Sequence, residues 1–150
     1  PILVEVQALV SKTPYGMPRR TAVGCDYNRV NMLLAILERH LQMDFGALDA
    51  YINIVGGMKI SEPAADLAVA SALVSSLRNK SVPAGTLIIG ELGLTGEVRR
   101  VGNIERRIQD AINLGFTRFI VPDSKISINN PKVEFIKVKN LAQALRFIFA

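Results

Sequence analysis

The sequence predicts an α/β fold in which a sheet is covered by helices and includes an internal hairpin. The chain has 150 residues, of which 49% are hydrophobic, and this is enough for one compact domain with a buried core over residues 1–150. Short apolar segments of strand type alternate with segments of helical periodicity through the second half. A glycine turn near residue 93 joins two further strand-like segments.

The first half of the chain predicts three strands and a helix. Apolar and polar residues alternate over 2–10, a loop rich in proline and glycine covers 11–20, and 21–24 forms a short strand. Asp26 or Asn28 caps a helix whose apolar residues recur at helical spacing, namely Val30, Leu33, Leu34, Leu37 and Leu41. A strand over 50–55 then runs into the flexible corner Gly56-Gly57.

The second half begins with a helix at Ser61-Glu62-Pro63, where serine accepts a free backbone N–H and proline loses no needed donor. We expect a strand at 87–89, a strand, turn and strand over 90–98, and a helix from Asn103 that ends at Gly115. Strands at 119–121 and 133–138 and a terminal helix over 141–149 complete the fold. No apolar run approaches the roughly 20 residues that cross a bilayer, so no membrane contact is predicted.

A basic charge balance indicates a polyanionic partner. Lysine and arginine number 18 against 13 acidic residues, which gives a net charge of +5. The chain has no tryptophan and only 6% aromatic residues, so phosphate contacts are favoured over stacking on unpaired bases. Three adjacent pairs are the candidate DNA-binding residues: Arg19 and Arg20, Arg99 and Arg100, and Arg106 and Arg107.

The same cations also fit roles that do not involve DNA. Neighbouring residues on a strand point to opposite faces, so only one of Arg99 and Arg100 need face DNA, and any pair could instead bind a neighbouring subunit. The loop before Arg19 and Arg20 can project, which favours that pair. The lysines near the end of the chain fit edge-strand protection as well as DNA binding, namely Lys125, Lys132, Lys137 and Lys139.

Catalytic and metal sites find little support among the residues. Cys25 is the only cysteine and His40 the only histidine, so no zinc site or histidine triad is expected, and the lone cysteine favours a cytoplasmic location. Gly85 to Gly90 has the glycine spacing of a phosphate loop, but Glu91 takes the lysine position. Ser61 and Lys59 are better explained as a helix cap and a solvated cation than as a catalytic dyad.

Two stretches resemble the proteolytic domain of Lon proteases. They are Pro63-Ala64-Ala65-Asp66 after the Gly56-Gly57 corner, and the run from Gly90-Glu91 through Gly96 to Ile104-Glu105. In this resemblance Ala64 stands at the nucleophilic serine and Glu105 at the catalytic lysine, so both catalytic positions are degenerate. The resemblance implies the Lon-like fold, also described as ribosomal protein S5 domain 2-like, without peptidase activity.

A closer resemblance is to the C-terminal Lon-like domain of the RadA, or Sms, family of bacterial DNA repair proteins. It rests on four stretches that cover the chain nearly end to end: 13–24, 26–30, 62–70 and 93–98. The chain starts at Pro1 in a strand pattern, and we expect a C-terminal fragment of a longer protein. In that family the missing parts are a zinc module and a RecA-like ATPase core.

The resemblance implies a non-catalytic scaffold that binds DNA and forms a homo-hexamer. The full-length protein would be an ATP-dependent DNA motor that uses ATP, magnesium and zinc to process branched DNA in homologous recombination, with the recombinase as a further partner. This chain itself is expected to hold no cofactor. Two alternatives stay open: an active peptidase that uses another serine, and a purely structural ring-assembly domain that does not bind DNA.

Overall fold

The computed structural model describes residues 2–14 and 16–150, so Pro1 and the Tyr15 of the 13–24 motif lie outside the described residues. The described chain divides into two compact units. We call them the first unit, which comprises Val4–Glu62 and Ala68–Ser81, and the second unit, which comprises Pro63–Leu67 and Val82–Ala150 with residues 2 and 3.

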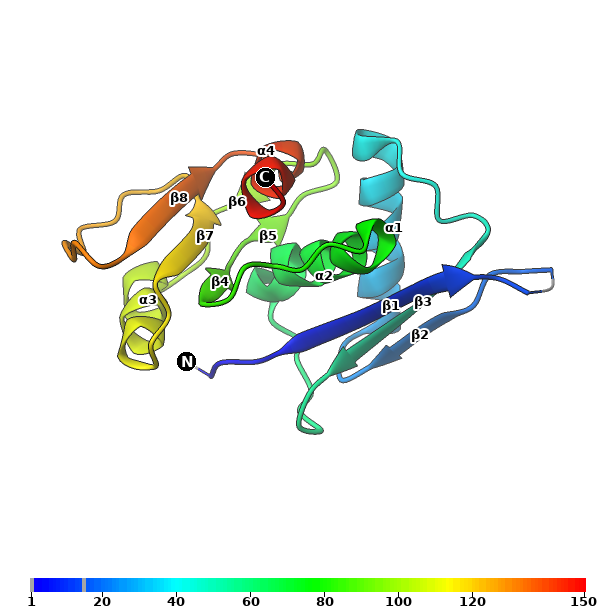
Figure 1. Ribbon diagram of the computed structural model, residues 1–150, viewed down its shortest axis with the longest axis horizontal. Coiled ribbons are helices and arrows are strands. Elements are labelled where there is room, and N and C mark those ends of the chain that lie inside the picture. The colour runs from blue at the N-terminus through cyan, green and yellow to red at the C-terminus, as the bar shows by residue number, and fades with distance from the viewer. Residues whose placement is uncertain (1, 15) are drawn as a thin grey trace. The chain divides into compact units, whose positions relative to one another are not determined.

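The first unit contains a mixed three-stranded sheet (Figure 1). Its strands are β1 (Val6–Lys12), β2 (Arg20–Val23) and β3 (Leu48–Ile54), in the order β1-β3-β2, with β1 antiparallel and β2 parallel to the central β3. The first predicted strand is displaced toward higher residue numbers. Since Val6 pairs with Ile54 and Lys12 with Leu48, the extent of β3 sets where β1 begins and ends.

Helix α1 (Tyr27–Leu41) follows the predicted pattern closely. Asp26 is the N-cap, and its side chain accepts a hydrogen bond from the Asn28 N–H at 3.2 Å. The buried face consists of Val30, Leu33, Leu34, Ile36 and Leu37. The buried side of the sheet is supplied by Ala50, Ile52 and Ile54, which alternate along β3. Gly56 and Gly57 both have positive φ, which confirms the predicted corner.

The next helix starts later than predicted. A 3₁₀ turn, η1 (Pro63–Ala65), precedes α2 (Asp66–Arg78), so Ser61 does not cap the helix. The Gly90 N–H donates to the Ala64 carbonyl at 2.9 Å and the Leu67 N–H donates to the Gly90 carbonyl at 3.0 Å. Ala64 and Leu67 are therefore paired with a distant segment where the chain passes from η1 into α2.

The second unit contains a parallel sheet and a separate hairpin. The sheet strands are β4 (Thr86–Ile88), β7 (Arg118–Pro122) and β8 (Glu134–Val138), and β5 (Glu91–Leu92) pairs with β6 (Val98–Arg99). The predicted α/β class and the internal hairpin are confirmed, but the strands among the described residues form three sheets instead of one. The Val98 N–H bonds to the Lys139 carbonyl at 2.9 Å, so the hairpin attaches after β8 and does not extend that sheet.

Two helices complete the second unit: α3 (Ile104–Asn113) and α4 (Leu141–Ile148). Ile108 and Ala111 of α3 pack in one apolar cluster with Phe119 and Val121 of β7. The rings of Phe119 and Phe135 lie 5.6 Å apart between centroids in that cluster. Gly115 follows α3 with a φ of +100°, which confirms the predicted helix end.

Candidate functional site

The loop between β1 and β2 carries the first arginine pair and is fastened by a single carboxylate oxygen. Oδ1 of Asp49 accepts hydrogen bonds from the Thr13 hydroxyl at 2.9 Å and from the Arg19 N–H at 2.7 Å. The Thr13 N–H also donates to the Ala47 carbonyl, and the Ala50 N–H to the Arg19 carbonyl, both at 3.0 Å. Asp49 is only 5% exposed. The two arms of the loop, at Thr13 and at Arg19, are therefore joined through Asp49 of β3.

Asp49 is held as an anion. The Arg19 backbone N–H is the largest cause that lowers the pKa of the Asp49 carboxyl below its ordinary value. The Thr13 hydroxyl and the charges of Arg19 and Arg20 lower this pKa further, while desolvation acts in the opposite direction. At neutral pH the carboxylate accepts both bonds, and its negative charge is directed at the base of the loop.

The two arginines of this pair have different roles. The Arg20 guanidinium is half-buried and donates through both terminal nitrogens, to the Leu48 carbonyl and, at 2.9 Å, to the Phe45 carbonyl. The Arg19 side chain is exposed. Arg20 therefore supports the segment before β3, and Arg19 is the member of the pair that presents its charge to solvent.

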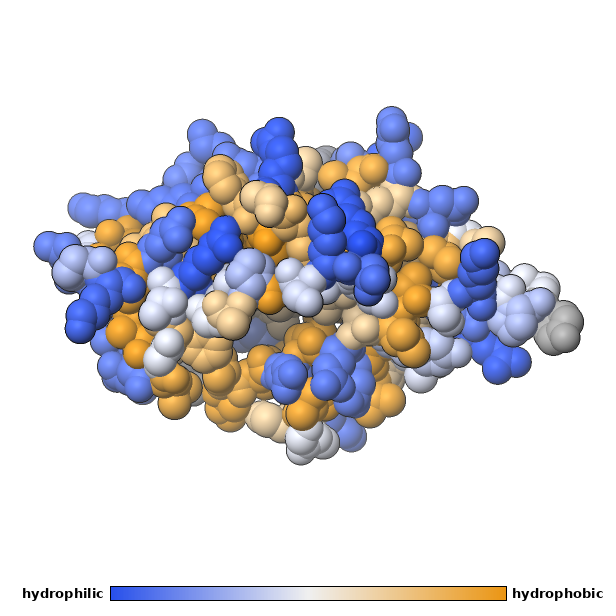
Figure 2. Space-filling view, viewed as in Figure 1, coloured by the Kyte–Doolittle hydropathy of each residue, from blue (hydrophilic) through white to orange (hydrophobic). Residues whose placement is uncertain are grey.

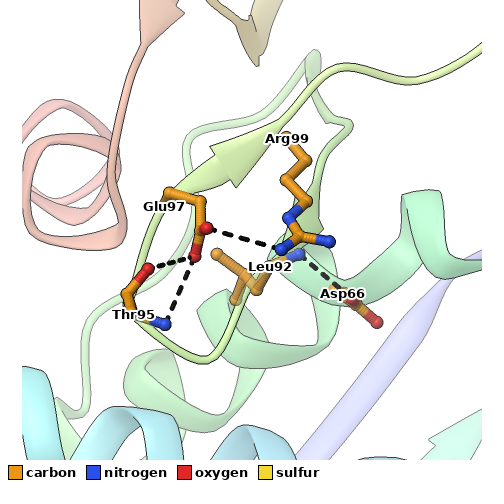
Figure 3. Close-up of polar contacts among 5 residues, drawn as sticks. All are labelled: Asp66, Leu92, Thr95, Glu97 and Arg99. Carbon is orange, nitrogen blue, oxygen red and sulfur yellow. Dashed lines mark hydrogen bonds and ion pairs between the residues drawn. The ribbon is translucent and has the colours of Figure 1, made fainter.

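The second arginine pair lies at the end of the β5–β6 hairpin, where Arg99 is the last residue of β6 (Figure 3) and Arg100 follows it. Oε2 of Glu97 lies 3.5 Å from a terminal nitrogen of Arg99, and its Oε1 accepts from the Thr95 hydroxyl at 2.7 Å and from the Thr95 N–H at 3.3 Å. Nε of Arg100 donates to the Asp123 carbonyl at 3.1 Å. Both arginines are exposed, and they contact different partners, as alternation along a strand predicts.

Glu97 organises the turn that precedes these arginines. The Thr95 hydroxyl is the main cause that lowers the pKa of the Glu97 carboxyl below its ordinary value, and the Arg99 charge adds a smaller contribution. A Cβ at Gly93 would lie 1.9 Å from Oε1 of Glu97, so only glycine leaves room for this carboxylate. Gly93 N–H also donates to the Glu97 carbonyl at 3.0 Å.

Ala64, at the degenerate serine position, is hydrogen-bonded through its backbone to a distant segment of the chain. Ala64 is 5% exposed and presents a methyl group where the Lon resemblance places a hydroxyl. Two residues later, Oδ2 of the buried Asp66 accepts a hydrogen bond from the Leu92 N–H at 3.0 Å (Figure 3). In the described chain this segment therefore ties the start of α2 to the hairpin, and Ala64 offers no nucleophilic atom.

The third arginine pair lies in the first turn of α3 with the degenerate lysine position. Glu105 is exposed, lies in the first turn of α3 and accepts a hydrogen bond from the Ser127 N–H. Nε of Arg107 donates to the Gly102 carbonyl at 2.9 Å, while Arg106 is exposed. Arg106 is the member of this pair with the greater access to solvent.

The remaining candidates of the sequence lie apart from these arginines. The glycine-spaced segment at 85–90 contains strand β4, whose residues pair with β7, and the Ile89 N–H is bonded to the Ile120 carbonyl at 3.0 Å. These amides are committed to the sheet, so the segment does not fit a phosphate loop. Lys59, Ser61 and His40 are exposed, and the described residues contain no group of three or more side chains suited to hold a metal ion.

Cys25 is half-buried between β2 and α1. Desolvation by burial, followed by the charge of Asp26, raises the pKa of its thiol. The carbonyl of the preceding Gly24 accepts from the Ile60 N–H at 2.6 Å, and a Cβ at Gly24 would lie 2.5 Å from the Met58 carbonyl. The surroundings are those of a packed residue, not of an activated thiol.

Sequence reasoning missed the two acidic residues that position the loops, Asp49 and Glu97. A weak signal existed for Glu97, because Gly93 and Gly96 bracket a tight turn immediately before it. No comparable signal exists for Asp49, since its partners Thr13 and Arg19 lie 36 and 30 residues away in the chain.

Comparison with known proteins places the chain in a family. Residues 8–125 match the model of the family described as subunit ChlI of Mg-chelatase. The chain belongs to this ChlI family. The ChlI match covers most of β1 and all of β2, the β5–β6 hairpin and α3.

Curated relatives carry a different name from the ChlI family. The chain is 48% identical to "DNA repair protein RadA" of Bacillus subtilis over 97% of its own length and 32% of the relative. It is 45% identical to the protein of the same name from Streptococcus pneumoniae, over 100% of this chain and 36% of the relative. The resemblance to RadA proteins is thereby confirmed, while the Lon-like fold stays a prediction. The chain spans about a third of the length of these relatives.

No helix in residues 2–14 and 16–150 combines the length and the hydropathy that crossing a bilayer requires.

Proposed function

We propose that this chain is a DNA-binding and oligomerisation domain, without peptidase activity, of a longer DNA repair protein. The observation that carries the proposal is the 45–48% identity, over nearly the whole chain, to relatives named DNA repair protein RadA. The net charge of +5 agrees with a polyanionic ligand. This chain spans only about a third of each relative, so the activity of the whole protein is likewise proposed.

The proposed DNA contacts are made by the exposed arginines, chiefly Arg19, Arg99, Arg100 and Arg106. Arg107 adds charge from the same turn of α3, and Arg20 supports the loop that presents Arg19. Figure 2 shows hydrophilic residues interspersed with hydrophobic ones on the face in view. The arginines lie on separate elements of the chain, so each would make its own phosphate contact, release counterions and add to the salt dependence of binding.

The absence of peptidase chemistry is proposed from the two degenerate positions. Ala64 has no nucleophilic atom, and Glu105 is an exposed carboxylate that accepts a hydrogen bond. Lys59 and Ser61 offer no replacement dyad, because both residues are exposed and such a dyad requires a sheltered cleft. The Lon-like fold would then serve as a scaffold.

For the longer protein we propose an ATP-driven DNA motor active in recombination, assembled as a homo-hexamer and acting beside the recombinase. ATP and magnesium would bind outside this chain, since the glycine-spaced segment of β4 does not fit a phosphate loop. Zinc would also bind outside it, since the described residues contain no group of three or more side chains suited to hold a metal ion. This chain would contribute contacts between subunits and a basic surface.

Fluorescence anisotropy tests the DNA-binding part directly. Labelled single-stranded, duplex and branched DNA are titrated with the chain at several salt concentrations, beside Arg19→Ala and a matched control, Arg39→Ala, on the exposed end of α1. We expect salt-sensitive binding that Arg19→Ala weakens and Arg39→Ala leaves nearly unchanged. Absence of binding at low salt would refute the DNA-binding role.

Two further measurements address the rest of the proposal. Light scattering reports the mass of the assembly, and a particle with the mass of a single chain would contradict the oligomerisation role. Incubation with a serine-reactive phosphonate, followed by mass spectrometry, is expected to leave the chain unmodified. A covalent adduct on one serine would instead support a peptidase.

A further inference from the structure

The loop between β1 and β2 carries an exposed apolar side chain, that of Met17. Met17 is 86% exposed, the highest value among the exposed large hydrophobic residues of the described chain. It lies between Gly16, which has a φ of +64°, and Pro18, and two residues before Arg19. A partner that buries this side chain would gain free energy from the apolar area removed from water.

Hydrogen bonds restrain the base of this loop. Asp49 holds Thr13 and Arg19 through one oxygen, and the Arg20 guanidinium is bonded to two carbonyls. A restrained base loses less conformational entropy on binding than an unrestrained one would.

The charge around Met17 favours nucleic acid over an apolar protein pocket. Lys12 and Arg19 are exposed on the two arms of the loop. The nearest carboxylate in this network, Asp49, is buried and engaged by Thr13 and Arg19. A phosphate approaching the loop therefore meets exposed positive charge, and Arg19 can contact the backbone beside the site that Met17 would enter.

We propose that Met17 inserts between stacked base pairs of duplex DNA while Arg19 contacts the adjacent phosphate. This inference rests on the DNA binding proposed above and specifies how the bound duplex is distorted. Proteins that kink DNA insert apolar side chains, methionine among them, at a base step and partly unstack it. The unbranched, polarisable methionine side chain adapts to such a gap.

A second exposed apolar residue provides a matched comparison. Leu94 is 70% exposed at the turn between β5 and β6. In this turn the side chain of Glu97 is 41% exposed and lies 3.5 Å from Arg99, so its negative charge offsets part of the positive charge near Leu94. In the loop of Met17 the acidic residue, Asp49, is buried. We therefore assign the wedge to Met17 and use Leu94→Ala as the control.

The test is base unstacking measured in duplexes that carry 2-aminopurine at successive positions, with anisotropy recorded on the same samples. Binding of the unaltered chain should raise the 2-aminopurine fluorescence at a base step. Met17→Ala should abolish this rise while it changes the affinity by no more than about threefold, because lost contact and avoided unstacking offset each other. Met17→Leu should retain most of the rise, and Leu94→Ala all of it.

The outcomes separate the wedge from DNA binding itself. Binding without any rise in fluorescence, or an equal rise with Met17→Ala, would overturn the wedge and leave the proposed function standing. No binding by the unaltered chain would overturn both. If Met17→Ala reduces the mass of the assembly and leaves the fluorescence rise intact, Met17 contacts protein and the inference is wrong. Circular dichroism of each variant excludes unfolding as the cause.

Discussion

Two turns of this molecule are each organised by one carboxylate, but the two carboxylates differ in burial. In the loop between β1 and β2, Asp49 is 5% exposed and joins residues that are distant in the chain. In the turn between β5 and β6, Glu97 has a side chain that is 41% exposed and bonds to Thr95, only two residues away. The backbone of the second turn is also closed independently, by the Gly93 N–H and the Glu97 carbonyl at 3.0 Å.

The two turns differ in how far their structure depends on the acidic side chain. The loop that carries Arg19 relies on Asp49, since the carboxylate itself connects its two arms. The turn that precedes Arg99 relies mainly on the hairpin, and Glu97 only restrains a short segment. An arginine after each turn follows the same division: Arg20 is structural and half-buried, whereas Arg99 is exposed.

The largest expected effect comes from the arginines. Arg20→Ala leaves the Phe45 and Leu48 carbonyls without their charged donor and should lower the free energy of unfolding by about 2 kcal/mol. Arg99→Ala removes an exposed ion pair and should cost less than about 0.5 kcal/mol. Urea denaturation of both variants measures the difference, and Arg20→Lys should fall between Arg20→Ala and the unaltered chain. Equal losses would remove the distinction between the two pairs.

The next effect is the pH dependence of Asp49. Its folded-state pKa is depressed, so its contribution to stability is fully present above the pKa of the unfolded chain and is lost as pH falls through the folded-state value. Asp49→Asn should therefore be less stable than the unaltered chain at neutral pH, and this difference should shrink on acidification. Urea denaturation at a series of acidic pH values measures it, with Glu97→Gln as the control of smaller amplitude. A difference that is constant with pH would contradict the role of the carboxylate.

The glycines provide a smaller effect. Gly93→Ala forces the Glu97 carboxylate to move away, since the added Cβ would lie 1.9 Å from Oε1. The variant should therefore lose the Thr95 bonds, and adding Glu97→Ala should produce almost no further loss. Gly16→Ala meets no neighbouring atom and should cost only about 1 kcal/mol, because its φ is +64°. Thermal melts of the single and double variants test the coupling, and additive losses would show that Glu97 acts independently of Gly93.

Local features of the sequence predicted the elements well. The cap at Asp26, the corner at Gly56-Gly57 and the helix end at Gly115 all depend on residues adjacent in the chain, and all are present in the structure. The predicted start of α2 was wrong. The chain there forms η1, and Ala64 of η1 pairs with Gly90, which lies 26 residues later. The grouping of the strands into three sheets also depends on pairings between distant segments, which periodicity does not encode.

The candidate site divides in the same way. The sequence identified the three arginine pairs, but it could not separate Arg19 from Arg20, because that distinction depends on the carbonyls of Phe45 and Leu48. The exposure of Met17 likewise depends on how the loop is folded onto β3. The degenerate positions Ala64 and Glu105 were read directly, since the identity of a side chain is sufficient to remove a nucleophile.

The salt dependence of duplex DNA affinity tests the central claim most directly. A plot of the logarithm of the binding constant against that of salt concentration should have a negative slope for the unaltered chain. Arg19→Ala should make this slope shallower by about one unit, because one phosphate contact is lost. Arg39→Ala should leave it unchanged. An identical slope for Arg19→Ala and the unaltered chain, or an affinity that does not depend on salt, would contradict the account.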